Sequence, residues 1–161
     1  VLQESIMVPE NYKYAINELP EMKSAIHDWY KNRYNVELTY DEMICLQGSQ
    51  EALSTLFLAM CDPGDIVLVP DPYYPIFSDG PKIAGAKVEY MPLLQENNYV
   101  IQLDQIDEEI AKKAKMMIVS YPNNPTCAIA PDSFYEELIQ FAKKYDIVVL
   151  HDNAYLSLIH I

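Results

Sequence analysis

Four short segments of the sequence carry the residues most suited to chemistry. Each follows an apolar run and offers hydroxyl, amide, aromatic or carboxylate groups: Gly48 to Leu53, Asp71 to Pro75, Tyr121 to Thr126 and His151 to Tyr155. Such groups at loop positions are typical of binding sites, because loops carry function on a rigid scaffold. Their chemistry suits a small ligand that combines an anion, a flat ring and a cationic centre.

The first segment indicates an anion site. Gly48 leads directly into a predicted helix, with the hydroxyl of Ser49 at the expected N-cap. Free N–H groups and the helix dipole at such a start favour a phosphate monoester. An ordinary N-cap serine, which stabilises a helix by about 1 kcal/mol, is the alternative, and this segment alone favours it.

The second segment places Tyr73 and Tyr74 between two prolines. One of the rings could stack on a flat heteroaromatic ligand. The alternative is a stiff turn whose tyrosines cover the core. The third segment holds the adjacent amides of Asn123 and Asn124 between prolines, which restricts the backbone strongly.

The fourth segment puts the carboxylate of Asp152 at the end of an apolar strand. A charge there is unfavourable unless it is paired, and no lysine or arginine is near in the sequence. A ligand with a protonated ring nitrogen would pair with Asp152, its phosphate would meet the helix at Ser49, and its ring would stack on Tyr74. One molecule meets all three requirements.

Alternating helices and strands are predicted to position these segments. The pattern indicates an α/β fold in three layers, with a mainly parallel sheet and helices on both faces. Ligands of such sheets bind at the carboxyl ends of the strands, where the four segments lie. The predicted helices are residues 20–34, 49–60, 103–114 and 132–145, and the predicted strands are 44–46, 66–69, 87–91, 116–120 and 147–150.

Composition restricts the class of protein. Half of the 161 residues are apolar and the net charge is -13, with Arg33 the only arginine, so nucleic acid is not an expected partner. The three cysteines, Cys45, Cys61 and Cys127, show neither disulfide nor zinc spacing. No apolar run approaches the roughly 20 residues that cross a bilayer. We expect an acidic cytoplasmic enzyme that binds neither metal nor membrane.

The order and spacing of these motifs resemble the class I/II aminotransferase family, whose members are pyridoxal 5'-phosphate (PLP) enzymes of fold type I. The resemblance runs from about Tyr14 to Tyr155, and it includes a lead-in segment around Leu19-Pro20. It implies that Ser49 and Gln50 contact the phosphate of PLP. It also implies that Tyr74 stacks on the pyridine ring.

The resemblance assigns the remaining groups as well. Asn124 and Tyr155 would hydrogen-bond the phenolic oxygen of PLP, and Asp152 would pair with its ring nitrogen, so that Asp152 and Tyr155 belong to the catalytic machinery. Tyr14 would reach across a homodimer to the partner's phosphate. The Asn124-Pro125 bond can be cis in this family.

Some positions depart from the family pattern. Cys127 and Glu18 stand where glycines are common, and Cys127 would be strained if its turn needs positive φ. The family's Schiff-base lysine comes after the Asp152 to Tyr155 motif and is absent here. We therefore expect residues 1–161 to be a lead-in and a partial large domain, without the C-terminal small domain and inactive alone.

The expected activity of the parent enzyme is transfer of an amino group between an L-amino acid and a 2-oxo acid. The residues of the motifs at Asp71 to Pro75 and Tyr121 to Thr126 favour resemblance to aspartate, alanine or LL-diaminopimelate aminotransferases. Two alternatives are a PLP-dependent carbon–sulfur lyase of the same fold and a non-catalytic ligand-sensing module. The module would need a basic DNA-binding segment, which the sequence lacks.

Overall fold

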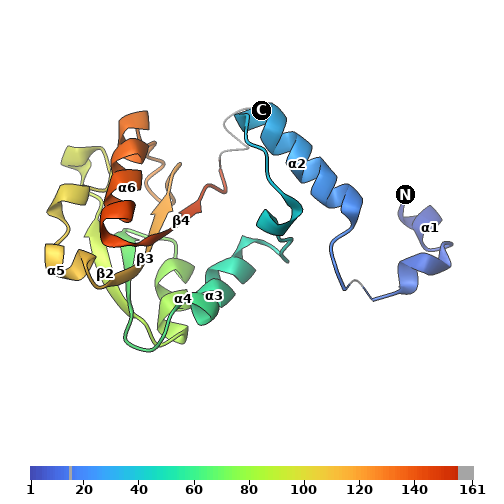
Figure 1. The fold of residues 1–161 in the computed structure, drawn as a ribbon, viewed down its shortest axis with the longest axis horizontal. Coiled ribbons are helices and arrows are strands. Elements are labelled where there is room, and N and C mark those ends of the chain that lie inside the picture. The colour runs from blue at the N-terminus through green and yellow to red at the C-terminus, as the bar shows by residue number, and fades with distance from the viewer. Residues whose placement is uncertain (15, 156–161) are drawn as a thin grey trace. The chain divides into compact units, whose positions relative to one another are not determined.

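The computed structural model describes residues 1–14 and 16–155, and the chain forms two units, Val1–Leu46 and Gln47–Ile161 (Figure 1). The N-terminal unit contains the short helix α1 (Leu2–Ser5) and the longer helix α2 (Pro20–Tyr34). Pro20 occupies the first turn of α2, where its missing N–H costs nothing. Asn35 ends α2 in the left-handed conformation. The helix predicted at 20–34 is therefore confirmed.

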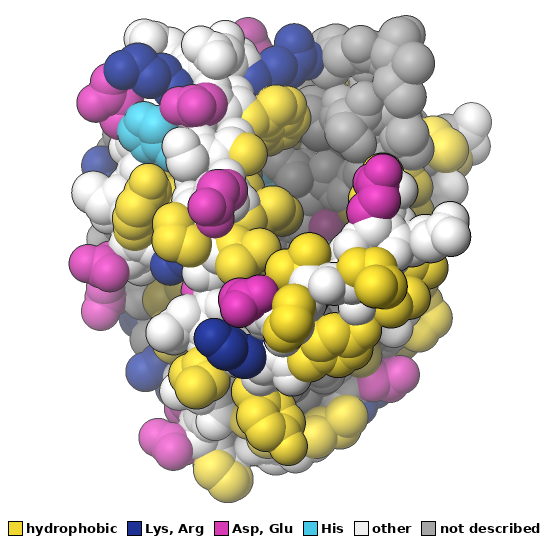
Figure 2. Space-filling view, turned by 90° about the vertical axis from the view of Figure 1, so that its right-hand side faces the viewer, with side chains coloured by type: hydrophobic (Ala, Val, Ile, Leu, Met, Phe, Trp, Pro, Cys, Tyr) yellow, Lys and Arg dark blue, Asp and Glu magenta, His cyan; other side chains and the backbone are white. Residues whose placement is uncertain are grey.

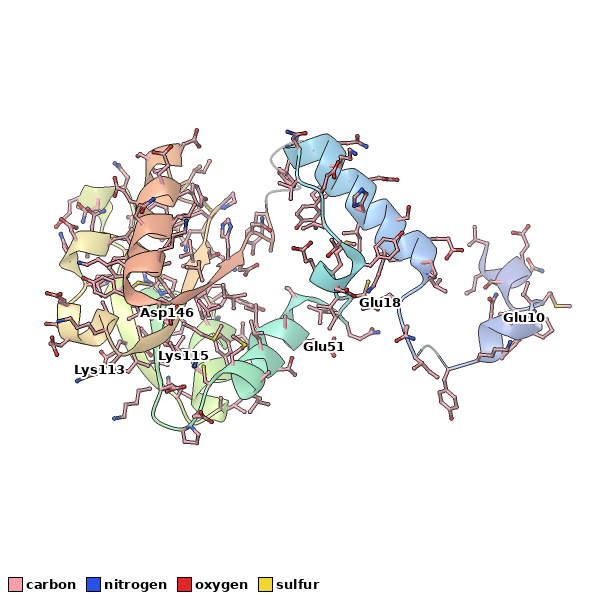
Figure 3. The ribbon with its side chains drawn as sticks, in the orientation of Figure 1. Glu10, Glu18, Glu51, Lys113, Lys115 and Asp146 are labelled. Atoms are coloured by element: carbon pink, nitrogen blue, oxygen red, sulfur yellow. The ribbon has the colours of Figure 1, made fainter. Side chains whose placement is uncertain are left out.

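The strand predicted at residues 44–46 is wrong. This segment has no regular secondary structure, no described strand pairs with it, and Ile44 is 75% exposed. The N–H of Cys45 donates instead to Oε1 of Glu18, which is labelled in Figure 3, at 2.9 Å, and Nζ of Lys23 lies 3.6 Å from the other oxygen of Glu18. The Glu18 side chain thus occupies a backbone donor that a strand neighbour would use.

The N-terminal unit has no buried core of its own among its described residues. Figure 2 shows hydrophobic side chains interspersed with charged ones on the face turned toward the viewer. The exposed hydrophobic residues of this unit include Leu2, Met7, Tyr14, Ile16 and Leu19.

The second unit is built on a four-stranded parallel sheet in the order β2-β1-β3-β4 (Figure 1). The strands are β1 (Ile66–Asp71), β2 (Lys87–Pro92), β3 (Ala114–Ser120) and β4 (Val148–Asp152). Burial on both faces explains the continuous apolar runs of β1 and β3. The four remaining strand predictions and the parallel sheet are confirmed.

Helices cover both faces of this sheet. One face packs against α3 (Ser49–Met60) and α4 (Ile76–Ile83), and the other against α6 (Asp132–Tyr145). Along β1, Leu68 belongs to the core under α6, because successive side chains of a strand point to opposite faces. The result is the predicted three-layer arrangement.

Two helices differ from the prediction. Helix α4 was not predicted, because it contains both Gly80 and Pro81, which disfavour helix interiors. The helix predicted at 103–114 is only α5 (Glu108–Ala111), preceded by a 3₁₀ turn. The Asp107 side chain accepts from the N–H groups of the first turn of α5, so it caps a new helix in mid-segment.

Helices α3 and α4 approach each other closely at Gly80. A Cβ atom at Gly80 would lie 2.2 Å from the backbone oxygen of Leu53 and 2.9 Å from the ring of Phe57. Both of these residues of α3 are buried. Glycine is therefore required here for the contact of two helices, and its backbone conformation is ordinary.

Replacing Tyr121 by phenylalanine should lower the free energy of unfolding by about 2 kcal/mol, because one buried and one partly buried backbone group lose their partner. The Tyr121 hydroxyl accepts from the N–H of Ile101 at 2.9 Å and donates to the oxygen of Tyr99 at 3.2 Å. Urea titration of the full-length protein measures the effect. Tyr40→Phe, which removes an exposed hydroxyl, is the control.

The same residue contributes to alkaline unfolding. Burial raises the pKa of Tyr121 from 10.0 to about 12, so the folded state holds this proton longer than the unfolded state does. Stability should therefore fall as pH rises from 10 to 12. An unchanged pH dependence in Tyr121→Phe would contradict this assignment.

Candidate active site

A pocket of about 200 Å³ lies at the carboxyl ends of the strands in the second unit. Its lining combines the start of α3, the loops after β1 and β3, and the end of β4: Ser49, Gln50, Tyr74, Asn124, Asp152, Ala154 and Tyr155. Six of the seven residues predicted to bind a cofactor thus come together. A larger groove of about 940 Å³ beside α6 contains none of them.

The pocket lies where the chain order of the sheet reverses. After β1 the chain forms β2 on one side of it, and then crosses to form β3 on the other side. The loops that follow β1 and β3 therefore diverge and leave a crevice, which is the usual ligand site of such sheets.

The start of α3 differs from the prediction in one detail. Gly48, with φ of 88°, is the N-cap, and Ser49 is the first helical residue rather than the cap. No side chain caps this end, and Ser49 lines the pocket. Glu51, labelled in Figure 3, accepts from the N–H of Gln47 at 2.6 Å. The ordinary N-cap role of Ser49 is therefore excluded.

A side-chain hydrogen bond joins the first turn of α3 to the loop after β1. Nε2 of Gln50 donates to the hydroxyl of Tyr74. The ring of Tyr74 also meets that of Phe77 edge to face, with centroids 5.9 Å apart. These contacts hold the Tyr74 ring at the wall of the pocket.

The two adjacent asparagines have different partners. Nδ2 of Asn124 donates to the Tyr155 hydroxyl at 3.0 Å, which leaves the Tyr155 proton free for another acceptor. Asn123 is buried, and its Oδ1 accepts from the N–H and the hydroxyl of Thr126 at 3.1 and 2.7 Å. Asn123 thus shapes the loop and Asn124 faces the pocket. The Asn124-Pro125 bond is cis.

Asp152 is the charged group of the pocket. It is half-buried at the end of β4, and burial raises the pKa of its carboxyl, against the smaller lowering effects of the Ala154 N–H and of His151. No salt bridge to Asp152 occurs among the residues that the structure describes. A partly desolvated carboxyl without a cation fits the protonated ring nitrogen of PLP.

Other predicted residues lie elsewhere. Tyr14 is 97% exposed in the N-terminal unit. The His151 ring contacts Tyr135 of α6, and burial lowers its pKa, which agrees with a strand-end role. Every lysine of the chain is within the described residues, and none lines the pocket.

Cys127 adopts a left-handed conformation, with φ of 60°, and its N–H donates to the oxygen of Asn123 at 2.8 Å. Cys127→Gly should raise the free energy of unfolding by about 1 kcal/mol in urea titrations, because glycine has no Cβ to clash there. Cys127→Ala keeps the Cβ and is the matched control. An equal gain in both variants would show that backbone strain is not the cause.

No group of three or more His, Cys, Asp or Glu side chains among the described residues could hold a metal ion. No described helix combines the length and the apolar character needed to cross a membrane.

Comparison with known proteins places this pocket in context. The family model "Aminotransferase class I and II" matches residues 7–160. LL-diaminopimelate aminotransferases of Halothermothrix orenii and Moorella thermoacetica are 48% and 42% identical over 94% and 91% of this chain, and it covers 40% and 38% of them. The chain therefore spans about 40% of the length of these relatives.

A solved structure agrees with this relationship. The substrate-bound structure of BacF from Bacillus subtilis superposes with a TM-score of 0.88 at 37% identity, over 94% of this chain and 39% of that one. Class I and II aminotransferases are PLP-dependent enzymes. The chain belongs to the class I and II aminotransferase family.

Proposed function

We propose that the full-length protein is a PLP-dependent aminotransferase that moves an amino group between an L-amino acid and a 2-oxo acid, with LL-diaminopimelate as the amino donor or product. The observation that best supports this proposal is the pocket, which is lined by six predicted cofactor ligands from four separate segments. The names of the relatives support the substrate, and they do not favour the alternative carbon–sulfur lyase or sensing module.

Each pocket residue has a distinct task in this proposal. The first turn of α3, with Ser49 and Gln50, binds the phosphate of PLP, where backbone N–H groups and the helix dipole favour an anion. Tyr74 covers one face of the ring. These contacts fix the cofactor at two points and exclude water from one side.

The remaining residues tune the ring. Asp152 pairs with the ring nitrogen and keeps it protonated, while Tyr155, oriented by Asn124, donates to the phenolic oxygen. PLP, when bound, supplies an electron sink for bond changes at the substrate Cα. A protonated ring nitrogen is what makes the ring an effective sink.

The proposal extends to parts that lie outside this pocket. We infer that residues 1–161 form the lead-in and part of the large domain, and that a lysine from the part of the family fold not spanned here binds PLP covalently. A homodimer in which Tyr14 reaches the partner's phosphate belongs to the same proposal, and the full exposure of Tyr14 supports it. The three free cysteines support a reducing, cytoplasmic setting.

The test is an amino-transfer assay with the full-length protein and PLP. LL-diaminopimelate, L-aspartate and L-alanine are each offered with a 2-oxo acid, and the amino acid formed is quantified. We expect the highest kcat/KM with LL-diaminopimelate. Release of ammonia or a thiol without a new amino acid would instead identify a lyase, and preference for L-aspartate or L-alanine would overturn the substrate assignment.

A further inference from the structure

Three hydroxyl groups, of Tyr73, Ser78 and Tyr90, form a cluster, and none of them belongs to a residue that lines the pocket. The Tyr90 hydroxyl on β2 is 3.1 Å from the Ser78 hydroxyl and 3.4 Å from that of Tyr73. The rings of Tyr73 and Tyr90 are nearly parallel, at 15° with centroids 5.5 Å apart. Tyr90 therefore touches one residue of the loop after β1 and one residue of α4.

These two contacts flank Tyr74 in the sequence. Tyr73 directly precedes it, and Ser78 lies in the first turn of α4, which begins just after the loop. The N–H of Phe77 donates to the oxygen of Tyr74 at 2.9 Å, so a backbone hydrogen bond connects Tyr74 directly to the first turn of α4. Fixing Tyr73 and Ser78 thus fixes the backbone on both sides of Tyr74.

The Tyr90 side chain has a rigid base of its own. Tyr90 pairs with Val69 in the parallel register of β1 and β2, and Val69 is fully buried. Ser78 is also fully buried, and the described partner of its side-chain hydroxyl is the Tyr90 hydroxyl. Tyr90 is 43% exposed, but the Ser78 hydroxyl is closed to water, so loss of the Tyr90 hydroxyl would leave a buried polar group without its partner.

The pKa values of the two tyrosines reflect the same contacts. The pKa of Tyr90 is lowered, mainly by its hydrogen bond with Ser78, whereas the pKa of Tyr73 is raised, mainly by its hydrogen bond with Tyr90. Either oxygen of each pair can be the donor, so the three hydroxyls form one connected hydrogen-bonded group.

We propose that Tyr90 is a positioning residue that holds the loop after β1 from both sides of Tyr74 and so fixes the Tyr74 ring against the cofactor. This inference rests on the proposed PLP site. Tyr90 acts through Tyr74 and does not itself line the pocket. Its hydroxyl, more than its ring, carries the effect.

The first test measures the loop in the cofactor-free, full-length protein. Hydrogen exchange at the amides of Tyr74 and of residues 76–78 should accelerate about fivefold in Tyr90→Phe, as expected for the loss of one hydrogen bond. Tyr135→Phe is the matched control, because the Tyr135 hydroxyl makes no hydrogen bond among the described residues and lies on α6. Unchanged exchange in Tyr90→Phe overturns the proposal, whether or not PLP binds.

The second test is a double-mutant cycle on PLP affinity, read from the cofactor absorbance. Tyr90→Phe should raise the Kd of PLP about fivefold in the wild-type background and leave it unchanged in a Tyr74→Leu background. Equal effects in both backgrounds would show a general structural role and overturn the proposal. Absence of PLP binding to the wild type would refute the proposed function, while the exchange experiment still decides the role of Tyr90.

Discussion

Asp152→Ala should weaken the binding of PLP to the full-length protein by about 100-fold. The half-buried carboxyl has no cation among the described residues, so the protonated ring nitrogen of PLP would be its partner. Removing one member of a desolvated charge pair costs about 2–5 kcal/mol, most of it because the other charge stays buried and unpaired. Absorbance titration with PLP measures the change.

The variant Asn153→Ala is the matched control, because Asn153 is adjacent to Asp152 but does not line the pocket. It should change the Kd less than about twofold, as for most surface substitutions. Asp152→Asn should bind PLP as weakly as the alanine variant, because the amide is not charged. Strong binding that survives both Asp152→Ala and Asn124→Ala would refute the site.

The same carboxyl should have the opposite effect on the cofactor-free protein. Burial raises the pKa of Asp152 above its unfolded value of about 3.8, so the folded state binds its proton more tightly. The free energy of unfolding therefore falls as pH rises from about 3.8 through the raised pKa of the folded state, and it stays reduced at neutral pH. Asp152→Asn should therefore stabilise the cofactor-free protein at pH 7 while it weakens PLP binding.

Gly80→Ala should lower the free energy of unfolding by about 3 kcal/mol, at the upper end for overpacked sites. The new Cβ would lie 2.2 Å from the Leu53 oxygen, and that backbone atom cannot rotate away as a side chain could. Helices α3 and α4 would have to separate. Urea unfolding followed by circular dichroism measures the loss.

The matched control is Asp79→Ala, an exposed substitution in the same helix. This substitution should lower the free energy of unfolding by about 0.5 kcal/mol, because it removes a negative charge from the first turn of α4. Since α3 and α4 also carry the Ser49 and Tyr74 regions, Gly80→Ala should weaken PLP binding as well. A stable Gly80→Ala protein would mean that the two helices can adjust without loss.

The strands of the second unit could be predicted because both faces of the sheet are covered. Strands such as β1 bury both faces, so they appear in the sequence as continuous apolar runs, such as Ile66 to Val69, that are easily identified. The apolar run at 44–46 looks similar, yet no described strand pairs with it, and the N–H of Cys45 donates to the Glu18 side chain instead. The local sequence pattern does not show which group will accept the hydrogen bond of a given backbone N–H.

The candidate site could be predicted from motif order more fully than from any single residue. Ser49, Tyr74 and Asp152 were inferred from the ligand groups they would satisfy, and the structure places them on one pocket. The positioning contact of Tyr90 could not be found this way. It depends on the register of β1 and β2, which brings together residues with no shared motif.

The separation of the pocket residues along the chain also sets when the site can exist during synthesis. Ser49 and Tyr155 lie at opposite ends of the second unit, and Asp152 belongs to the last strand of the sheet among the described residues. At about 5–20 residues per second, a ribosome needs roughly 5–20 s between making the first and the last of these residues. Until β4 has paired with β3, Asp152 is not in place at the end of the sheet. The proposed cofactor can therefore stabilise only chains in which the whole sheet has formed.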